Sequence, residues 1–430
     1  MIATQFKNLG FSVVSEYASF SRLGRTKGNS KSALFLPPAA AVGSLGDEAM
    51  IIGSICHLRS QGFNRFGIVS FDSACQWGYL DGVDEVIKVE KRSDYWSFIE
   101  AMKYYSHFYC IGADVMDGFY GDIGVLRLTK LTQLAAKTGA ETRILGFSFN
   151  QNPTPTAVQA LNELPSKVSL CARDPISHQR LTQNIQRPVE LVADLAFLLP
   201  PASNSGLVAE VLQWVQVQKA SDRIVLGVNV NNLFSRFNKN LTVAKLVDVY
   251  VKTMTELLNH HPNLSFLMMP HDSRGDESDV SLAANVLEAL SKTSNEHTYQ
   301  VPFPCRADEI KAICAEVDLV VTGRMHLAIA CLGQATPVAG ITYQGKFEGL
   351  FEHFSLNPQE MLITPENALQ AGKLAAFMMN VIPQREAIKE QIQAELGKVQ
   401  ALARQNFTDL ETKENFPVES IQSLASGVIS

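Results

Sequence analysis

The stretch VTGRMHLAIACLGQATPVAGITYQGKFEGL, from Val321 to Leu350, decides the fold. The apolar run over residues 318–321 predicts a buried strand, and a tight turn then leads into an apolar helix from about Arg324 to Gly333. Residues 337–341 form another apolar run of strand length. This order predicts one unit of a parallel sheet, and such sheets bind ligands beyond the carboxyl ends of their strands.

Two potential cations, Arg324 and His326, follow the turn of this unit, and Lys346 follows the next strand. Free N–H groups at a helix N-terminus favour an anion, and a guanidinium can hold a phosphate or carboxylate through two hydrogen bonds. We therefore expect an anionic small molecule to bind here. A surface ion pair for Arg324 and a buried structural role for His326 are the simpler alternatives.

The same alternation of strands and helices extends over most of the chain. Strand-like runs occur at residues 65–70, 85–89, 107–111, 143–149, 167–171 and 189–192, and again at residues 223–229, 264–269, 298–301 and 318–321. A proline- and serine-rich segment at residues 198–206 separates the two series. The predicted fold class is α/β, with Rossmann-like domains at residues 31–205 and 220–380 in a glycosyltransferase-B-like arrangement and the active site in the interdomain cleft. Residues 1–30 are predicted as an N-terminal arm, and residues 381–430 as a C-terminal helix and tail.

Composition bounds the function classes. The chain has 430 residues, of which 46% are apolar, enough to fill two cores. Its net charge of −6 argues against a nucleic-acid partner, although a few cations in a cleft can still bind an acidic ligand. Seven scattered cysteines predict buried free thiols and a reducing compartment. No metal motif, secretory signal or bilayer-length apolar run is evident, so the protein is expected to be cytoplasmic, as a monomer or a homo-oligomer.

The end of the N-terminal arm is basic, with Arg22, Arg25, Lys27 and Lys31. A solvated surface arm is the simpler interpretation. The alternative is a weak peripheral contact with anionic lipid at the inner face of a membrane.

The pattern over residues 321–350 also resembles a known family. An apolar strand, G-R-M-H, a small apolar helix, Pro-Val and Y-x-x-K look like the C-terminal signature of the polysaccharide pyruvyl transferases. Members of that family move pyruvate from phosphoenolpyruvate onto a sugar as a ketal. The resemblance implies phosphoenolpyruvate as co-substrate without a further cofactor, and a saccharide or lipid-linked saccharide as acceptor. It implies donor binding by Arg324, Met325 and Lys346, and proton delivery by His326.

A second motif of the family has a counterpart in the first predicted domain. The segment CARDPISHQRL follows a predicted strand and resembles the family's R-D-x-x-S through Arg173, Asp174 and Ser177. Asp174 followed by proline is also an ordinary helix start, which is enough to explain the aspartate. Arg173 is left as a second group that could bind the donor.

A glycine-containing loop precedes the first long helix. GSLGDEAM, residues 43–50, resembles the family's G-N-x-G-D-E loop, which implies acceptor deprotonation by Asp47 and an acceptor contact at Ser44. Ser44 stands where the family commonly has asparagine. Asp47 and Glu48 are also the acidic residues that a first helical turn prefers, so a structural role is the alternative for both.

Two further loops supply candidates for the acceptor pocket. Residues 111–121 occupy the place of a glycine-rich loop of the family, but Ala113 and Asp114 interrupt the glycine run. We expect Asp114 or Asp117 to bind a sugar hydroxyl. The P-H-D segment after another predicted strand would place His271 in the same cleft, whereas an ordinary loop residue is the alternative.

Together these features predict an enzyme that transfers pyruvate from phosphoenolpyruvate to a sugar and releases phosphate. The first alternative is a nucleotide-sugar-dependent glycosyltransferase of the same architecture, which would need a uridine pocket and an acidic ribose ligand in the second domain. A non-catalytic saccharide-binding relative is the second alternative, since Ser44 and Asp114 depart from the family pattern.

Overall fold

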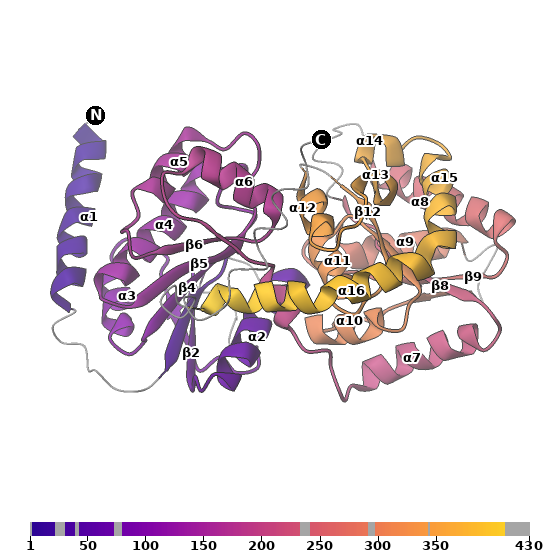
Figure 1. The fold of residues 1–430 in the computed structure, drawn as a ribbon, viewed down its shortest axis with the longest axis horizontal. Helices are drawn as coiled ribbons and strands as arrows, with labels where there is room; N and C mark the ends of the chain where they lie inside the picture. Colours follow the sequence, from indigo (N-terminus) through magenta and orange to yellow (C-terminus); the bar gives the residue numbers. More distant parts are fainter. Residues whose placement is uncertain are drawn as a thin grey trace.

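The computed structural model describes residues 2–21, 31–38, 43–72, 80–232, 241–290, 297–342 and 345–408. Two α/β lobes lie side by side, each formed by a parallel sheet with helices packed on it (Figure 1). This confirms the predicted fold class. Arg22, Arg25 and Lys27, on which the predicted lipid contact of the arm depends, lie outside the described residues, as do Cys75 and the tail after residue 408. The other six cysteines are free thiols.

The first domain contains a seven-stranded sheet in the order β3-β2-β1-β4-β5-β6-β7, with neighbouring strands parallel. The order reverses between β1 and β4, so the loops after these strands border a crevice. The strands are β1 Ser32–Leu36, β2 Arg65–Ser70, β3 Glu85–Lys88, β4 His107–Ala113, β5 Glu141–Phe147, β6 Ser169–Ala172 and β7 Glu190–Leu191. The helices are α1 Ile2–Ser21, α2 Leu45–Ser60, α3 Asp94–Met102, α4 Asp122–Lys137, α5 Pro155–Asn162, α6 Pro175–Asn184 and the 3-10 helix η3 Leu195–Leu198.

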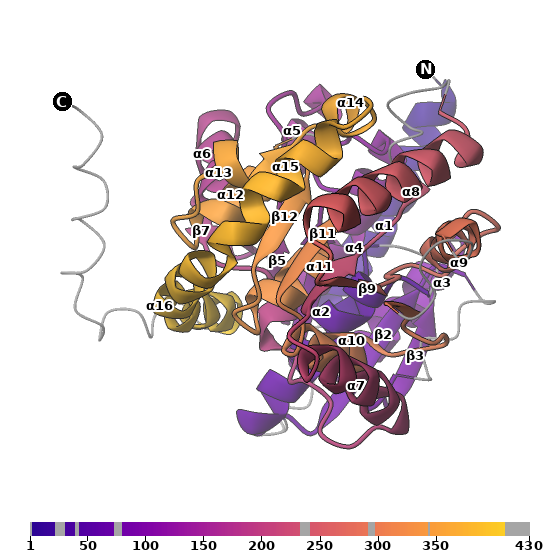
Figure 2. The same ribbon diagram turned by 90° about the vertical axis from the view of Figure 1, so that its right-hand side faces the viewer.

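The second domain repeats this plan with a six-stranded sheet in the order β10-β9-β8-β11-β12-β13. Its strands are β8 Ile224–Val228, β9 Leu264–Met268, β10 Thr298–Gln300, β11 Leu319–Thr322, β12 Val338–Ile341 and β13 Leu362–Ile363. Its helices are α7 Gly206–Lys219, α8 Val243–His260, α9 Asp279–Leu290, α10 Ala307–Cys314, α11 Met325–Leu332, α12 Lys346–Glu352, α13 Pro358–Met361, α14 Pro365–Ala368 and α15 Lys373–Val381. Helix α15 lies beside α8, and α7 lies beside α10 (Figure 2). Helix α7 therefore packs within the second domain, although the sequence left residues 206–219 unassigned.

The N-terminal segment differs from the predicted surface arm. Helix α1 packs against α3 and α4 at the outer end of the first domain (Figure 1). Val14 and Ala18 are buried there, one helical turn apart, and Tyr17 contacts the ring of Trp96 edge-on at 4.8 Å between centroids. The i, i+4 spacing of small apolar residues gives the helix one face that can pack, which explains why the segment is not a free arm.

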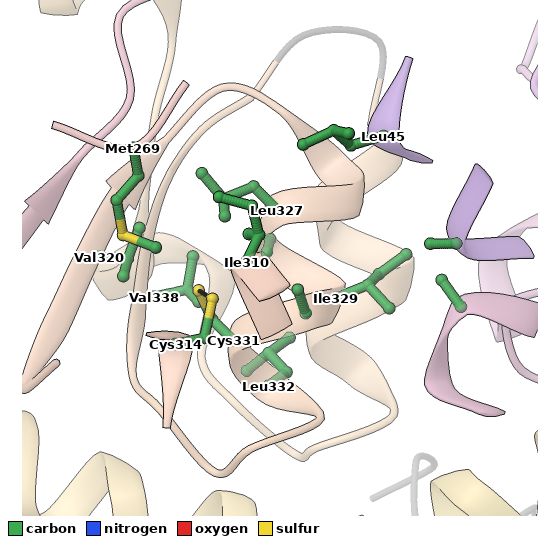
Figure 3. Packing of buried hydrophobic residues seen from close by; sticks show 14 of the residues in the cluster. Leu45, Met269, Ile310, Cys314, Val320, Leu327, Ile329, Cys331, Leu332 and Val338 are labelled. Carbon is green, nitrogen blue, oxygen red and sulfur yellow. Dashed lines mark hydrogen bonds between the residues drawn. The ribbon is translucent and has the colours of Figure 1, made fainter. Parts of the chain in front are cut away.

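The two domains share a continuous apolar interior. Leu45, at the start of α2 in the first domain, belongs to the same buried cluster as Leu327 and Ile329 of α11 in the second (Figure 3). Helix α2 also packs against η3, α10 and α11. The interface therefore holds the loops at the carboxyl ends of both sheets close together.

The chain finally returns to the first domain through helix α16, Arg385–Arg404, which extends from the second domain to the first (Figure 1). Asn406 follows it and is fully buried. Its Oδ1 accepts a hydrogen bond from Gly146 N at 2.7 Å, and its Nδ2 donates to Ala193 O at 2.9 Å. The C-terminal helix thus connects the two domains.

Candidate active site between the two domains

A pocket of about 300 Å³ lies between the domains at the carboxyl ends of their strands. It contains the residues that the sequence singled out from both halves of the chain, with one exception. Those lining it are Ser44, Asp47, Asp114, Arg173, His271, Arg324, Met325, His326 and Lys346. This is the position at which open α/β sheets bind ligands.

The exception is Asp117, which does not line the pocket and is 2% exposed. Its Oδ1 accepts from the amide of Phe119 at 2.9 Å, and its Oδ2 accepts from the amide of Asn150 at 3.1 Å. Both carboxylate oxygens therefore hold loop backbone, and the structure does not bring Asp117 to the pocket with the other predicted site residues.

The start of helix α2 is attached to the second domain. Ser44 is the N-cap of α2 and forms an isolated antiparallel bridge with Asp272. The amide of Leu45 donates to the carbonyl of His271 at 3.4 Å. A loop of the first domain and the loop after β9 thus form one wall of the pocket, which brings Asp47 and His271 to the same site.

A carboxylate that the sequence analysis missed, Asp194, joins the two halves of the site. Its Oδ2 accepts from Nη1 of Arg173 at 3.2 Å and lies 3.8 Å from Nε2 of His326. Its Oδ1 accepts from the amide of Ala196 at the start of η3. Arg173 also donates to Ser148 Oγ at 3.0 Å. Since Asp194 and Arg173 are each 2% exposed, these contacts fix Arg173 in one position against the second domain.

Helix α2 packs directly against His326. A Cβ atom on Gly46 would lie 2.3 Å from Nδ1 of His326, closer than any real contact. Only glycine therefore allows the imidazole to occupy this position beside the first turn of α2.

Arg324 has two carboxylate partners. Its Nη2 and Nε donate to the two oxygens of Asp279 at 2.6 and 3.1 Å, and its Nη1 donates to Asp272 at 3.2 Å. The sequence predicted that Arg324 itself binds the donor anion, and this role stays a prediction. The structure shows its guanidinium held by these carboxylates at the pocket wall, because Asp279 begins helix α9 next to it.

Lys346 bridges the domains at the other side of the pocket. Its Nζ donates to Asp114 Oδ2 at 2.6 Å and to the hydroxyl of Tyr120 at 3.2 Å, and Tyr120 donates to Asp114 at 3.0 Å. Burial alone would raise the pKa of Asp114, but Lys346, Arg173 and the hydrogen bond from Tyr120 together outweigh this effect and lower it. Asp114 is therefore ionised and paired with a lysine.

Burial sets the protonation of three groups in the pocket. It raises the pKa of Asp47 to about 7, although Arg274 acts in the opposite direction. It lowers the pKa of His271 to about 3, and His326 and Arg324 add to the effect. It also lowers the pKa of His326, against the opposing influence of Asp194. Near neutral pH, the site thus combines a half-ionised carboxyl with a neutral His271.

Several nitrogens at this site have no hydrogen-bond partner among the residues that the structure describes. They are Nε of Arg173, Nε2 of His326 and both ring nitrogens of His271. Buried polar atoms are normally satisfied, and unsatisfied ones at a pocket are available to a ligand. Four cationic side chains, Arg173, Arg274, Arg324 and Lys346, line the pocket against three carboxylates, Asp47, Asp114 and Asp272.

Sequence reasoning missed four functional neighbours: Asp194, Asp279, Arg274 and Tyr120. Arg274 lies three residues after His271, so its position in the strand-end loop was the available signal. Asp194 lies three residues after the end of the last strand of the first sheet, which gives the same signal. Asp279 and Tyr120 are recognisable only through their partners in space.

Within the described ranges, no group of three or more His, Cys, Asp or Glu side chains is arranged to hold a metal ion. Searching the same residues for a helix both long and apolar enough to cross a bilayer gives none.

Comparisons with solved structures define the class of fold. A protein of Listeria monocytogenes assigned as a UDP-N-acetylglucosamine 2-epimerase superposes with a TM-score of 0.59 at 9% identity, covering 90% of this chain and 97% of that one. UDP-GlcNAc 2-epimerase from Neisseria meningitidis gives 0.51 at 9%, covering 87% and 97%. HepE of Anabaena, solved with UDP and glucose, gives 0.50 at 14%, covering 92% and 99%. The chain thus has the two-domain fold of GT-B glycosyltransferases and the related epimerases.

The family follows from the sequence. The profile of the polysaccharide pyruvyl transferases matches residues 45–345, more than half of the chain. A search of curated proteins finds no match to this chain. This protein belongs to the polysaccharide pyruvyl transferase family, and at that level it is a transferase of polysaccharide biosynthesis.

Proposed function

We propose that this protein transfers pyruvate from phosphoenolpyruvate to two hydroxyls of a sugar residue, forming a ketal and releasing phosphate. The observation that carries the proposal is the single pocket in which Arg173 of the first domain meets Arg324, His326 and Lys346 of the second. Phosphoenolpyruvate carries a carboxylate and a phosphate on a three-carbon frame, so a small pocket with several fixed cations suits it.

The charges of the donor have identifiable partners. Arg173 keeps a buried Nε without a partner and is oriented by Asp194, so it is our first candidate for binding the donor. Lys346 would exchange Asp114 for the donor, or hold both. Arg324 is paired with Asp279 and Asp272. At the pocket wall it would contribute positive electrostatic potential and help to define the shape of the donor site.

Proton transfer needs an acid and a base. The methylene carbon of the donor takes up a proton, which leaves positive character on the adjacent carbon. We assign this delivery to His326, whose Nε2 makes no hydrogen bond to a described residue and lies 3.8 Å from Asp194 Oδ2. A bound anion would oppose the effect of burial on the pKa of His326 and favour its charged form.

Asp47 is our candidate base for the acceptor. Its pKa of about 7 is close to the value that suits proton exchange at neutral pH. The first sugar hydroxyl gives its proton to Asp47 as its oxygen bonds to the activated carbon. The second hydroxyl then bonds to the same carbon and displaces phosphate, which takes up the proton of that hydroxyl as it leaves, and the ring closes. His271 and Ser44 line the same pocket and would contact the sugar.

The decisive test is phosphate release from phosphoenolpyruvate with galactose- or mannosamine-containing acceptors that have free 4- and 6-hydroxyls. The product should gain the mass of pyruvate less one water. Arg173→Lys, which keeps the charge but loses the planar fork, should lower kcat/KM by roughly 10²–10³. Absence of phosphate release across a broad acceptor set would contradict the proposal.

The test also separates the alternatives. A nucleotide-sugar-dependent glycosyltransferase would instead consume a UDP-sugar. HepE was solved with UDP and glucose, but its likeness to this chain concerns the fold alone. A non-catalytic relative would bind the saccharide without turning over either donor.

A further inference from the structure

A second cleft lies at the outer end of the first domain, between α1, α3 and α4, and we call it the outer cleft. At about 560 Å³ it is larger than the pocket between the domains. Its charged lining consists of four cations, Lys91, Arg92, Arg127 and Lys130, and one acid, Glu90. This excess of positive charge is found in a protein whose net charge is −6.

Arg92, Arg127 and Lys130 make no ion pair with a carboxylate anywhere in the described part of the chain. Instead, Arg127 lies over the ring of Phe71 at 4.6 Å, and Lys130 lies over the ring of Phe11 at 5.6 Å. Burial and the neighbouring Arg92 lower the pKa of Lys130. Aromatic rings thus orient these cations without neutralising them, so an anion in the cleft would relieve their repulsion.

The same region exposes apolar side chains. Val14 and Val89 are buried in the lining, while Trp96 is 40% and Ile123 is 80% exposed. Six of the eight exposed large apolar side chains in the described residues lie on α1, on α3 or in residues 119–123, namely Val13, Phe20, Trp96, Phe119, Tyr120 and Ile123. Within the cleft, the cations lie beside the exposed Trp96 and Ile123, a combination typical of surfaces that contact lipid.

The outer cleft and the interdomain pocket are adjacent in the chain. Tyr120 lines the interdomain pocket, and Ile123, three residues later, lines the outer cleft. The linings of the two sites are thus connected by one short segment of the chain, residues 120–123.

We propose that the outer cleft binds an anionic lipid, with its phosphate between Arg92, Arg127 and Lys130 and its apolar chain against Trp96 and Ile123. Binding there would place the first domain on a negatively charged membrane surface. The inference does not depend on which reaction the pocket performs.

The test is co-sedimentation of the full chain with vesicles of phosphatidylcholine alone or mixed with phosphatidylglycerol. Binding should require phosphatidylglycerol and weaken as salt rises from about 0.05 to 0.5 M. The double variant Arg127→Glu/Lys130→Glu should lower the partition coefficient by about tenfold or more. Lys373→Glu/Lys389→Glu, with the same charge change on exposed positions of the second domain, should bind like the wild type.

Ile123→Ser tests the apolar contact independently, because it changes no charge and Ile123 is 80% exposed. We expect its partition coefficient onto phosphatidylglycerol vesicles to be severalfold lower. Circular dichroism and the unfolding midpoint verify that each variant is folded. Equal loss in both double variants, or no binding to phosphatidylglycerol vesicles, would overturn the proposal. Binding of soluble glycerol phosphate without any binding of vesicles would also overturn it, because the cleft would then hold a free anion rather than a lipid.

Discussion

The interdomain pocket and the outer cleft are both lined by several cationic side chains, but the partners of these cations differ. In the pocket, Arg173 is paired with Asp194, and Lys346 is paired with Asp114. In the outer cleft, Arg127 and Lys130 face aromatic rings instead of carboxylates. Paired cations are held in one geometry, which is what a reaction needs from its charges. Unpaired cations attract any anion that approaches, which suits docking on a surface.

This comparison predicts that removing charge has opposite consequences in the two places. Breaking a buried pair leaves an uncompensated charge inside the protein and is costly. Removing one of several repelling cations near the surface costs little and can stabilise the fold.

The largest effect is expected for Asp194→Asn. The buried Arg173 would lose its counter-ion, so the free energy of unfolding should fall by about 3–5 kcal/mol. Phosphate release should fall as well, because both Arg173 and His326 depend on the same carboxylate oxygen. Denaturant unfolding measures the first effect.

The matched control for that change is Asp248→Asn, which breaks the exposed pair with Lys252. Its effect on unfolding should stay below about 0.5 kcal/mol. Equal destabilisation by the two variants would mean that the paired geometry of the pocket contributes nothing special.

The next effect is expected for Gly46→Ala, which introduces a Cβ 2.3 Å from Nδ1 of His326. The imidazole must shift, and a displacement of about 1 Å in an active site typically costs about 10² in turnover. Steady-state kcat/KM for phosphate release measures it. Gly124→Ala, where a Cβ would meet nothing within 4 Å, should retain wild-type kinetics.

An intermediate effect is expected from the ionisation of Asp47. Burial raises its pKa from 3.8 to about 7, so the folded state favours the protonated form. The cost of ionisation is absent at low pH, grows as pH rises from about 4 to 7, and is complete above about 7. Asp47→Asn should therefore gain roughly 2–3 kcal/mol of stability relative to the wild type between pH 5 and pH 8.

The same carboxyl should shape the activity profile. If Asp47 is the base, kcat/KM should rise with pH and level off above about 7. Arg274 lowers the pKa of Asp47, so Arg274→Ala should move the inflection to higher pH. If the pH dependence of kcat/KM were unchanged in Arg274→Ala, the rise on the acidic side would have to come from a group other than Asp47.

The smallest effect is expected for Lys130→Gln in the outer cleft. Burial and Arg92 lower the pKa of Lys130, so its charge opposes folding. Removing the charge should raise the free energy of unfolding by at most about 0.5 kcal/mol, since much of the side chain is solvated. This gain in the free energy of unfolding should shrink at high salt. If Lys130→Gln instead destabilised the protein as much as Asp194→Asn, the proposed difference between the outer cleft and the interdomain pocket would be wrong.

Much of this arrangement can be predicted from sequence because it depends on periodicity. Strand ends at the carboxyl side of a parallel sheet converge, so Arg173, His271, Arg324 and Lys346 could be placed together from their positions after apolar runs. Their roles in catalysis stay predictions. Asp117 occupies such a loop too, but its carboxylate turned inward to bind backbone amides.

What the sequence could not supply is pairing between distant residues. Asp279 precedes Arg324 by 45 positions, and nothing local shows that its carboxylate holds that guanidinium. Helix α7 was missed because the proline- and serine-rich segment before it has the composition of a linker. Helix α1 was missed because its packing partners, α3 and α4, follow much later in the chain.

The buried amide of Asn406 has a consequence for synthesis. Two backbone groups of the first domain, Gly146 N and Ala193 O, form hydrogen bonds with a side chain that follows the first of them by 260 positions. At a translation speed of about 5–20 residues per second, a ribosome needs roughly 13–50 seconds to supply it. Throughout that interval the nascent first domain lacks the two hydrogen bonds from Asn406. A chaperone can bind this part of the domain until helix α16 has been synthesised and has packed.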